Sequence, residues 1–191
     1  MPYPPTAAGA LVDSVVGLYM AVVILRLLFQ LLRVEFHNPL VRLTLAATDP
    51  PLRLLRRLIP VTRWRGIDPA TAVFIWLLAL VNVAVPHLLA DADFRWGGAL
   101  VVGLADALDQ VVWVFLIAVL ARVVLSWVAP TSMHPAVRLV YQLSAPVLAP
   151  FQRILPTLGG LDFSPLAALF GLNLMQKWLI APLADFGFRL L

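Results

Sequence analysis

Two arginines and two aspartates of this sequence lie in or beside long apolar stretches. Arg26 and Arg122 interrupt such stretches, and Asp68 and Asp162 come just before the next ones. A charge at the centre of a membrane helix costs at least roughly 2.5–3.5 kcal/mol on insertion scales, so it needs a partner or a polar path. The spacing predicts two equivalent ion pairs, Arg26 with Asp68 and Arg122 with Asp162. Two other interpretations stay open, in which the aspartates cap helices and Arg122 extends to the lipid headgroups.

Other polar side chains within the apolar stretches offer hydrogen bonds between helices. Asn82 and His87 lie in one stretch, and Asn173, Gln176 and Lys177 lie in another. Amide side chains can hydrogen-bond between membrane helices. A wet cavity that holds ions is the alternative interpretation.

The sequence carries no motif of an enzyme that we can identify. His37, His87 and His134 are not spaced as metal ligands, and there are no cysteines. Neither a phosphate-binding P-loop nor an H-E-x-x-H motif occurs. We therefore expect a protein that is not an enzyme and that requires neither a metal nor a cofactor.

The composition indicates that the chain folds in an apolar solvent. Of its 191 residues, 62% are hydrophobic and 13% are charged, whereas soluble domains have about 45–50% and about 25%. So few charged side chains cannot cover the surface of a small globule. The net charge of +4 would suit nucleic acid, but few aromatic residues lie among the arginines, so we do not expect nucleic-acid binding.

Four stretches are long enough to cross a membrane. A hydrocarbon core of about 30 Å requires roughly 20 apolar residues, and the stretches that qualify are 11–32, 70–90, 106–129 and 165–186. Asp106 and Asp109 then stand at the start of the third span, and Lys177 and Pro182 interrupt the fourth. Residues 1–10 hold no Lys or Arg and are expected to be a short tail rather than a signal peptide. The predicted fold class is an all-α membrane protein with four transmembrane helices.

The basic residues predict how these spans are oriented. The loop 33–69 carries seven arginines and the loop 130–164 carries two, whereas the connection between the second and third spans carries only Arg95. Because basic loops stay in the cytoplasm, we expect both long loops inside and both termini outside.

The sequence also repeats itself. At a spacing of 96 residues the following pairs coincide: Arg26 and Arg122, Pro39 and Pro135, Arg42 and Arg138, Pro50 and Pro146, Arg57 and Arg153, and Pro60 and Pro156. Each copy then reads as span, loop, span, over 11–90 and 106–191, with 91–105 as the connection. Two crossings per copy make the copies parallel, with a pseudo-two-fold axis along the membrane normal. A duplication kept only for packing is the alternative.

The loop inside each copy is too apolar for a solvated loop and too rich in proline for a span. Pro146 and Pro150 each lack a backbone donor and are expected to break the second loop into short pieces. We predict kinked amphipathic helix in the headgroup plane, with arginines that bind anionic lipid or an acidic partner surface. The candidate arginines are Arg42, Arg53, Arg56, Arg57, Arg138 and Arg153. A solvated charge run that serves only topology is the alternative.

Residues 122–165 carry a family motif. Its members are Arg122, Ser126-Trp127, Pro135, Pro146, Pro150, Arg153, Pro156, Gly159-Gly160, Asp162 and Ser164-Pro165. In this order and spacing they closely resemble the YggT (YlmG) family of membrane proteins. The first copy departs from the motif, with Gln30-Leu31 in place of Ser126-Trp127 and Ala70-Thr71 in place of Ser164-Pro165. A role of the motif is therefore assigned to the second copy.

The resemblance implies a multi-pass protein of the bacterial inner membrane with a role in envelope maintenance, cell division, assembly of membrane complexes or osmotic-stress tolerance. We expect a non-enzymatic scaffold or assembly factor that contacts anionic lipids and a membrane or division protein, with a homo-oligomer as an open alternative. An ion channel or transporter active in osmotic adaptation is the competing hypothesis.

Overall fold

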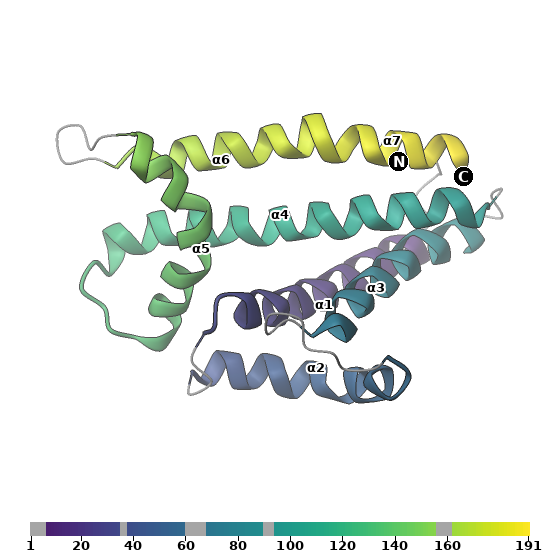
Figure 1. Ribbon diagram of the computed structural model, residues 1–191, viewed down its shortest axis with the longest axis horizontal. Coiled ribbons are helices and arrows are strands. Elements are labelled where there is room, and N and C mark those ends of the chain that lie inside the picture. The colour runs from purple at the N-terminus through teal and green to yellow at the C-terminus, as the bar shows by residue number, and fades with distance from the viewer. Residues whose placement is uncertain (1–6, 35–37, 60–67, 90–93, 156–161) are drawn as a thin grey trace.

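The computed structural model describes residues 7–34, 38–59, 68–89, 94–155 and 162–191, which form helices and no strands (Figure 1). Four helical runs are long and apolar enough to cross a membrane: α1 (Ala7–Leu31), α3 (Pro69–Leu89), α4 (Trp96–Val128) and the continuous run Ser164–Leu190. Large apolar side chains stay exposed along them, including Leu18, Ile117 and Trp178. Such surfaces suit lipid rather than water. The prediction of an all-α protein with four membrane-spanning helices is confirmed.

The third span begins earlier than expected. Helix α4 starts at Trp96, within the segment 91–105 that was predicted to be a connection. The two aspartates suggested a membrane boundary, but the apolar residues before Asp106 continue the helix. Asp106 and Asp109 therefore lie inside a long helix rather than at its end.

The fourth span passes through its two predicted interruptions. It consists of α6 (Ser164–Met175), the π-helix η1 (Gln176–Ile180) and α7 (Ala181–Leu190). Pro182 stands in the first turn of α7, directly after the wider π turn. A π turn can contain backbone groups that the regular α-helical hydrogen-bond pattern would leave unpaired. Such turns are frequent at functional sites.

The loops inside the two halves form single helices, α2 (Pro39–Leu58) and α5 (Pro135–Ile154). Each begins with a proline after a capping side chain, Asn38 or His134, which accepts a hydrogen bond from a backbone N–H two residues later. The prediction that prolines break the second loop into pieces is wrong. Pro146 and Pro150 are exposed on the outer side of α5, where the carbonyl groups that they leave unpaired can be solvated.

The helices pack in two groups around α4. Helices α1 and α3 lie side by side on one flank of α4, and the α6–α7 run lies on the other (Figure 1). Helix α2 packs on α1 and α3, whereas α5 crosses α4 and α6. Buried Leu139 and Leu143 of α5 join the apolar cluster that contains Met20 and Ile24 of α1. This cluster is therefore shared by the two halves.

Helices α4 and α7 approach each other closely at two glycines. A Cβ atom added to Gly98 would lie 2.7 Å from the carbonyl oxygen of Gly187, and one added to Gly187 would lie 2.9 Å from the backbone nitrogen of Val102. Small residues allow such approach between membrane helices, where packing replaces the hydrophobic effect as the driving force. These glycines hold the fourth span against α4.

Candidate functional site

Arg26 is the most deeply buried charge among the described residues of the first half, and its ion pair is with Asp49 rather than Asp68. The side chain is 5% exposed, and its Nη1 lies 2.7 Å from Asp49 Oδ1 and 2.7 Å from Thr48 Oγ1. The expected pair of Arg26 with Asp68 is therefore replaced. The reason is that α2 packs on α1 and brings its own carboxylate to the guanidinium.

Asp68 is buried as well and pairs with Arg56. The Nε of Arg56 donates to Asp68 Oδ2 at 2.8 Å, and Asp68 Oδ1 accepts from the backbone N–H of Ala70 at 3.1 Å. Gln30 Oε1 accepts from the backbone N–H of Asp68 at 3.1 Å. Asp68 thus caps α3 and holds the end of α2. Arg56 was predicted to bind lipid, but it forms an ion pair with the buried Asp68 instead.

Neither ion pair has a counterpart in the second half. At the spacing of 96 residues, Ala145 stands in place of Asp49 and Gln152 in place of Arg56. Arg122 Nη1 lies 3.4 Å from Ser144 Oγ, and its guanidinium stacks on the ring of Tyr141 at 4.7 Å. Among the described residues no carboxylate lies within ion-pair distance of Arg122.

Asp162 caps α6 instead of pairing with Arg122. Its Oδ1 accepts from the backbone N–H of Ser164 at 2.8 Å, and its Oδ2 accepts from Gln152 Nε2 at 3.2 Å. Interactions with Ser164 are the main cause that lowers the pKa of the Asp162 carboxyl, and the charge of Arg122 is a minor one. The capping interpretation holds, and the predicted Arg122–Asp162 ion pair does not form.

A cavity of about 530 Å³ separates these two opposite charges. It lies between the end of α4, the middle of α5 and the start of α6. Its lining consists of Leu120, Arg122, Val123, Ser126, Trp127, Tyr141, Asp162, Pro165, Leu166 and Leu169. Five of these residues belong to the motif identified in the sequence: Arg122, Ser126, Trp127, Asp162 and Pro165. The motif is thus brought together around one space with a cation on one side and a carboxylate on the other.

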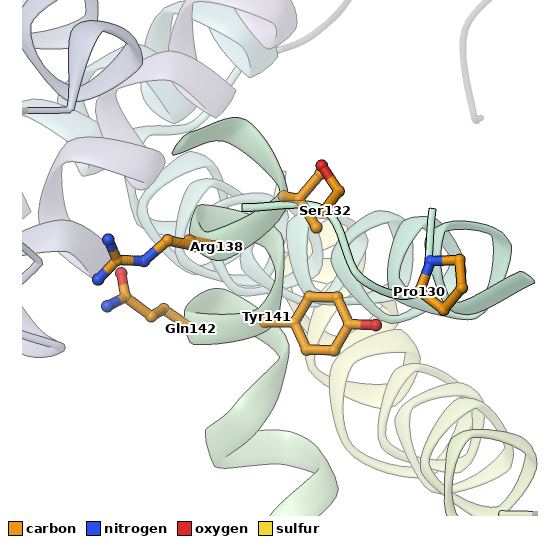
Figure 2. Close-up of a pocket in the computed structure, with 6 residues that line it drawn as sticks. Pro130, Ser132, Arg138, Tyr141 and Gln142 are labelled. Atoms are coloured by element: carbon orange, nitrogen blue, oxygen red, sulfur yellow. The ribbon is translucent and has the colours of Figure 1, made fainter. Parts of the chain in front are cut away.

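A second hollow of about 340 Å³ adjoins this cavity, because Tyr141 lines both. Pro130, Ser132, Arg138 and Gln142 also line it. In Figure 2 the side chains of Arg138 and Gln142 extend in the same direction from α5, away from the ring of Tyr141. Arg138 and Gln142 are both exposed, whereas Tyr141 is half-buried.

The other predicted arginines are exposed on two helices. Arg42, Arg53 and Arg57 of α2 are exposed, as are Arg138 and Arg153 of α5. At about 100° per residue, the three arginines of α2 fall on one side of the helix. We call these five exposed arginines the basic surface; Arg56 is not part of it.

A cluster of polar side chains lies inside the membrane-spanning helices, and it was only partly recognised from the sequence. Asn82 Nδ2 donates to Asp13 Oδ1 at 2.8 Å and to Asp106 Oδ2 at 3.3 Å. Gln176 Nε2 donates to Asp109 Oδ1 at 2.8 Å. The roles expected for Asn82 and Gln176 between helices thus agree with the geometry. The sequence feature that could have identified Asp106 and Asp109 is their spacing of three residues within an apolar run.

The remaining sequence candidates have simpler surroundings. His87 is buried, with Nδ1 2.7 Å from the carbonyl oxygen of Val83, whereas Asn173 and Lys177 are exposed. The described residues contain no group of three or more histidines or carboxylates that suits a metal ion. Four candidates lie outside the described residues: His37, Pro156, Gly159 and Gly160.

Comparison with known proteins finds one family. A family model described as CCB3/YggT matches residues 6–89 and 101–183. "Uncharacterized protein PA0392" of Pseudomonas aeruginosa is 38% identical over 94% of this chain and 91% of its own. An uncharacterized protein of Vibrio alginolyticus is 36% identical over 91% and 95%, and "Uncharacterized protein YggT" of Escherichia coli K12 is 30% identical over 82% and 80%. No solved structure matches.

Proposed function

The chain belongs to the CCB3/YggT family, and from this premise we propose that it is a non-enzymatic scaffold or assembly factor of the bacterial inner membrane. The basic surface of α2 and α5 carries the proposal, because it presents five exposed arginines outside the four spans. Such a surface attracts anionic headgroups and acidic protein segments. A role in envelope or division complexes and in osmotic-stress tolerance belongs to the same proposal.

One structural feature and one comparison support the repeat on which this proposal builds. Helices α2 and α5 have 20 residues each and begin at equivalent prolines. The family model also matches two segments, one in each half. In the arrangement we propose, both helices lie at the cytoplasmic interface and both chain termini lie outside.

The ion pairs of the first half would make α2 a rigid platform. Arg26 holds the middle of α2 through Asp49, and Arg56 holds its end through Asp68. A partner that docks on a fixed surface loses less conformational freedom than one that docks on a mobile loop. Arg26 and Arg56 then carry the structural role, and the exposed arginines contact the partner.

Copurification tests the scaffold role. Arg53→Ala together with Arg57→Ala removes two exposed charges of α2, and the full chain is purified from membranes in a mild detergent. We expect a defined membrane or division protein to accompany the wild type and to be lost with the double variant. Arg95→Ala, an exposed arginine before α4, is the matched control. An unchanged partner list in the double variant would refute the proposal.

The polar cluster inside the spans favours a second candidate function, an ion channel or transporter. Asn82 joins Asp13 of α1 to Asp106 of α4 and is 8% exposed. Carboxylates inside membrane helices often mark ion or proton pathways. Vesicles that contain the purified protein should then show cation flux that is reduced by Asp106→Asn and unaffected by Asp185→Asn. Vesicles with no flux would exclude this candidate.

A further inference from the structure

The cavity of the second half is lined by Arg122 and Asp162, which stand at the repeat positions of Arg26 and Asp68. In the first half Asp49 neutralises Arg26, and Arg56 neutralises Asp68. In the second half Ala145 and Gln152 take the places of Asp49 and Arg56. Arg122 and Asp162 keep their charges but have no charged partner among the described residues. A ligand that carries both charges would complete the arrangement.

The Arg122 side of the cavity is suited to a phosphate. The guanidinium stacks on Tyr141 at 4.7 Å, and its one hydrogen bond within the described residues goes to Ser144 Oγ at 3.4 Å. A stacked guanidinium keeps its edge donors free for an oxyanion, which it binds with two parallel hydrogen bonds. Ser126 also lines the cavity, and its hydroxyl donates to the carbonyl oxygen of Val123 at 2.7 Å.

The Asp162 side is suited to an ammonium group. Each carboxylate oxygen accepts one uncharged donor, from Ser164 or Gln152, so lone pairs remain for a cation. Trp127 lines the same cavity and is 80% exposed. An indole ring adds a cation–π contact to a nearby ammonium group.

The walls of the cavity indicate where the ligand comes from. Leu120, Val123, Leu166 and Leu169 line it from α4 and α6, both of which are spans. The apolar walls lie beside the charged groups near the ends of these helices, as the acyl chains of a lipid lie beside its headgroup. A phospholipid of the surrounding bilayer fits this order of polar and apolar contacts.

We propose that this cavity binds a phospholipid with a phosphoethanolamine headgroup, whose phosphate contacts Arg122 and whose ammonium contacts Asp162. An anionic headgroup, such as that of phosphatidylglycerol, carries a phosphate but no ammonium group. It would bring a negative charge near Asp162 without a cation to neutralise it. A choline headgroup lacks the N–H donors that the carboxylate accepts. The inference requires a membrane location but not the scaffold role, so either can fail without the other.

Lipid retention by the full chain tests the site. The protein is reconstituted in nanodiscs that contain equal amounts of phosphatidylethanolamine, phosphatidylcholine and phosphatidylglycerol, extracted into mild detergent, and weighed with its bound lipid by native mass spectrometry. We expect phosphatidylethanolamine to be retained about tenfold over either competitor, as one additional charge-assisted hydrogen bond would give.

Two variants that copy the first half sharpen the test. Ala145→Asp should supply Arg122 with a carboxylate, because Ser144 contacts Arg122 as Thr48 contacts Arg26. Gln152→Arg should supply Asp162 with a guanidinium in the same way. Both positions are exposed, so the fold should tolerate the changes. Each variant should lose the preference for phosphatidylethanolamine, whereas Arg42→Ala should keep it.

Three outcomes would overturn the proposal. The first is equal retention of the three lipids by the wild type. The second is an unchanged preference in both Ala145→Asp and Gln152→Arg. The third is a preference for phosphatidylglycerol that only Ala145→Asp removes, because this would mean that Arg122 binds a phosphate without help from Asp162.

Discussion

Replacing Asp49 with alanine should destabilise the protein strongly, because it leaves a buried arginine without its counter-ion. Breaking a fully buried ion pair costs about 3–5 kcal/mol of unfolding free energy. The Asp49 side chain is 31% exposed, and Arg26 would keep its hydrogen bond to Thr48 Oγ1. We therefore expect Asp49→Ala to lower the unfolding free energy by about 2–3 kcal/mol, which is less than breaking a fully buried pair would cost.

The same carboxylate provides the control. Arg53 Nη2 lies 3.9 Å from Asp49 Oδ2, and its side chain is 74% exposed. An exposed pair contributes at most about 1 kcal/mol, so Arg53→Ala should have a small effect. Reversible unfolding in mixed micelles, followed by circular dichroism as the denaturing detergent is increased, measures both variants. Asp49→Asn removes the charge but keeps a hydrogen-bond acceptor, and it should lie between them.

The comparison can refute the reasoning directly. If Asp49→Ala and Arg53→Ala cost the same, the burial of Arg26 does not determine the strength of its pair. If Asp49→Ala has no effect, α2 is held on α1 by its apolar contacts alone.

Further predictions concern the spans and the capping aspartate. Gly98→Ala should weaken the contact of α4 with α7, because the added Cβ would meet the carbonyl oxygen of Gly187 at 2.7 Å, whereas Gly97→Ala has open space around it and should be neutral; thermal unfolding in detergent compares the two. Asn82→Leu should destabilise by about 1 kcal/mol, since it removes two hydrogen bonds within the membrane that average about 0.6 kcal/mol each, as equilibrium unfolding would show. The pKa of Asp162 is lowered from its usual 3.8 in the folded protein, so its contribution to stability is complete above pH 3.8 and disappears as the pH falls through the lowered value. The difference in unfolding free energy between wild type and Asp162→Asn should therefore shrink in acid; a difference that grows there would contradict the assignment.

The sequence was sufficient to predict the spans, because each depends on a local property. A run of about 20 apolar residues identifies a membrane helix wherever it lies in the chain. The same local reasoning failed for the start of α4, where Asp106 suggested a boundary although a hydrogen bond from Asn82 accommodates it inside the helix. It failed for α5 as well, because the effect of Pro146 depends on which side of the helix faces outward.

The ion pairs depended on information that spacing does not contain. The repeat correctly singled out Arg26 and Asp68 as charges in need of partners. Their actual partners, Asp49 and Arg56, both belong to α2, a segment that the sequence suggested to be a lipid-facing surface. Only the packing of α2 on α1 and α3 brings these four groups together, and a charge on an amphipathic segment gives no sign of which way it turns.

The difference between the two halves argues that the cavity is more than a packing defect. A half-buried cation without a counter-ion is unfavourable, and one substitution, Ala145→Asp, would remove that cost by copying the solution already present at Asp49. Ser144 preserves the contact of Thr48 with the arginine, so the local geometry for such a pair is in place. An unpaired arginine and an unpaired aspartate facing one cavity are stable together if a ligand neutralises both. Binding at this site should therefore stabilise the second half more than the first, and removing phosphatidylethanolamine should lower the unfolding temperature of the wild type but not of the Ala145→Asp variant.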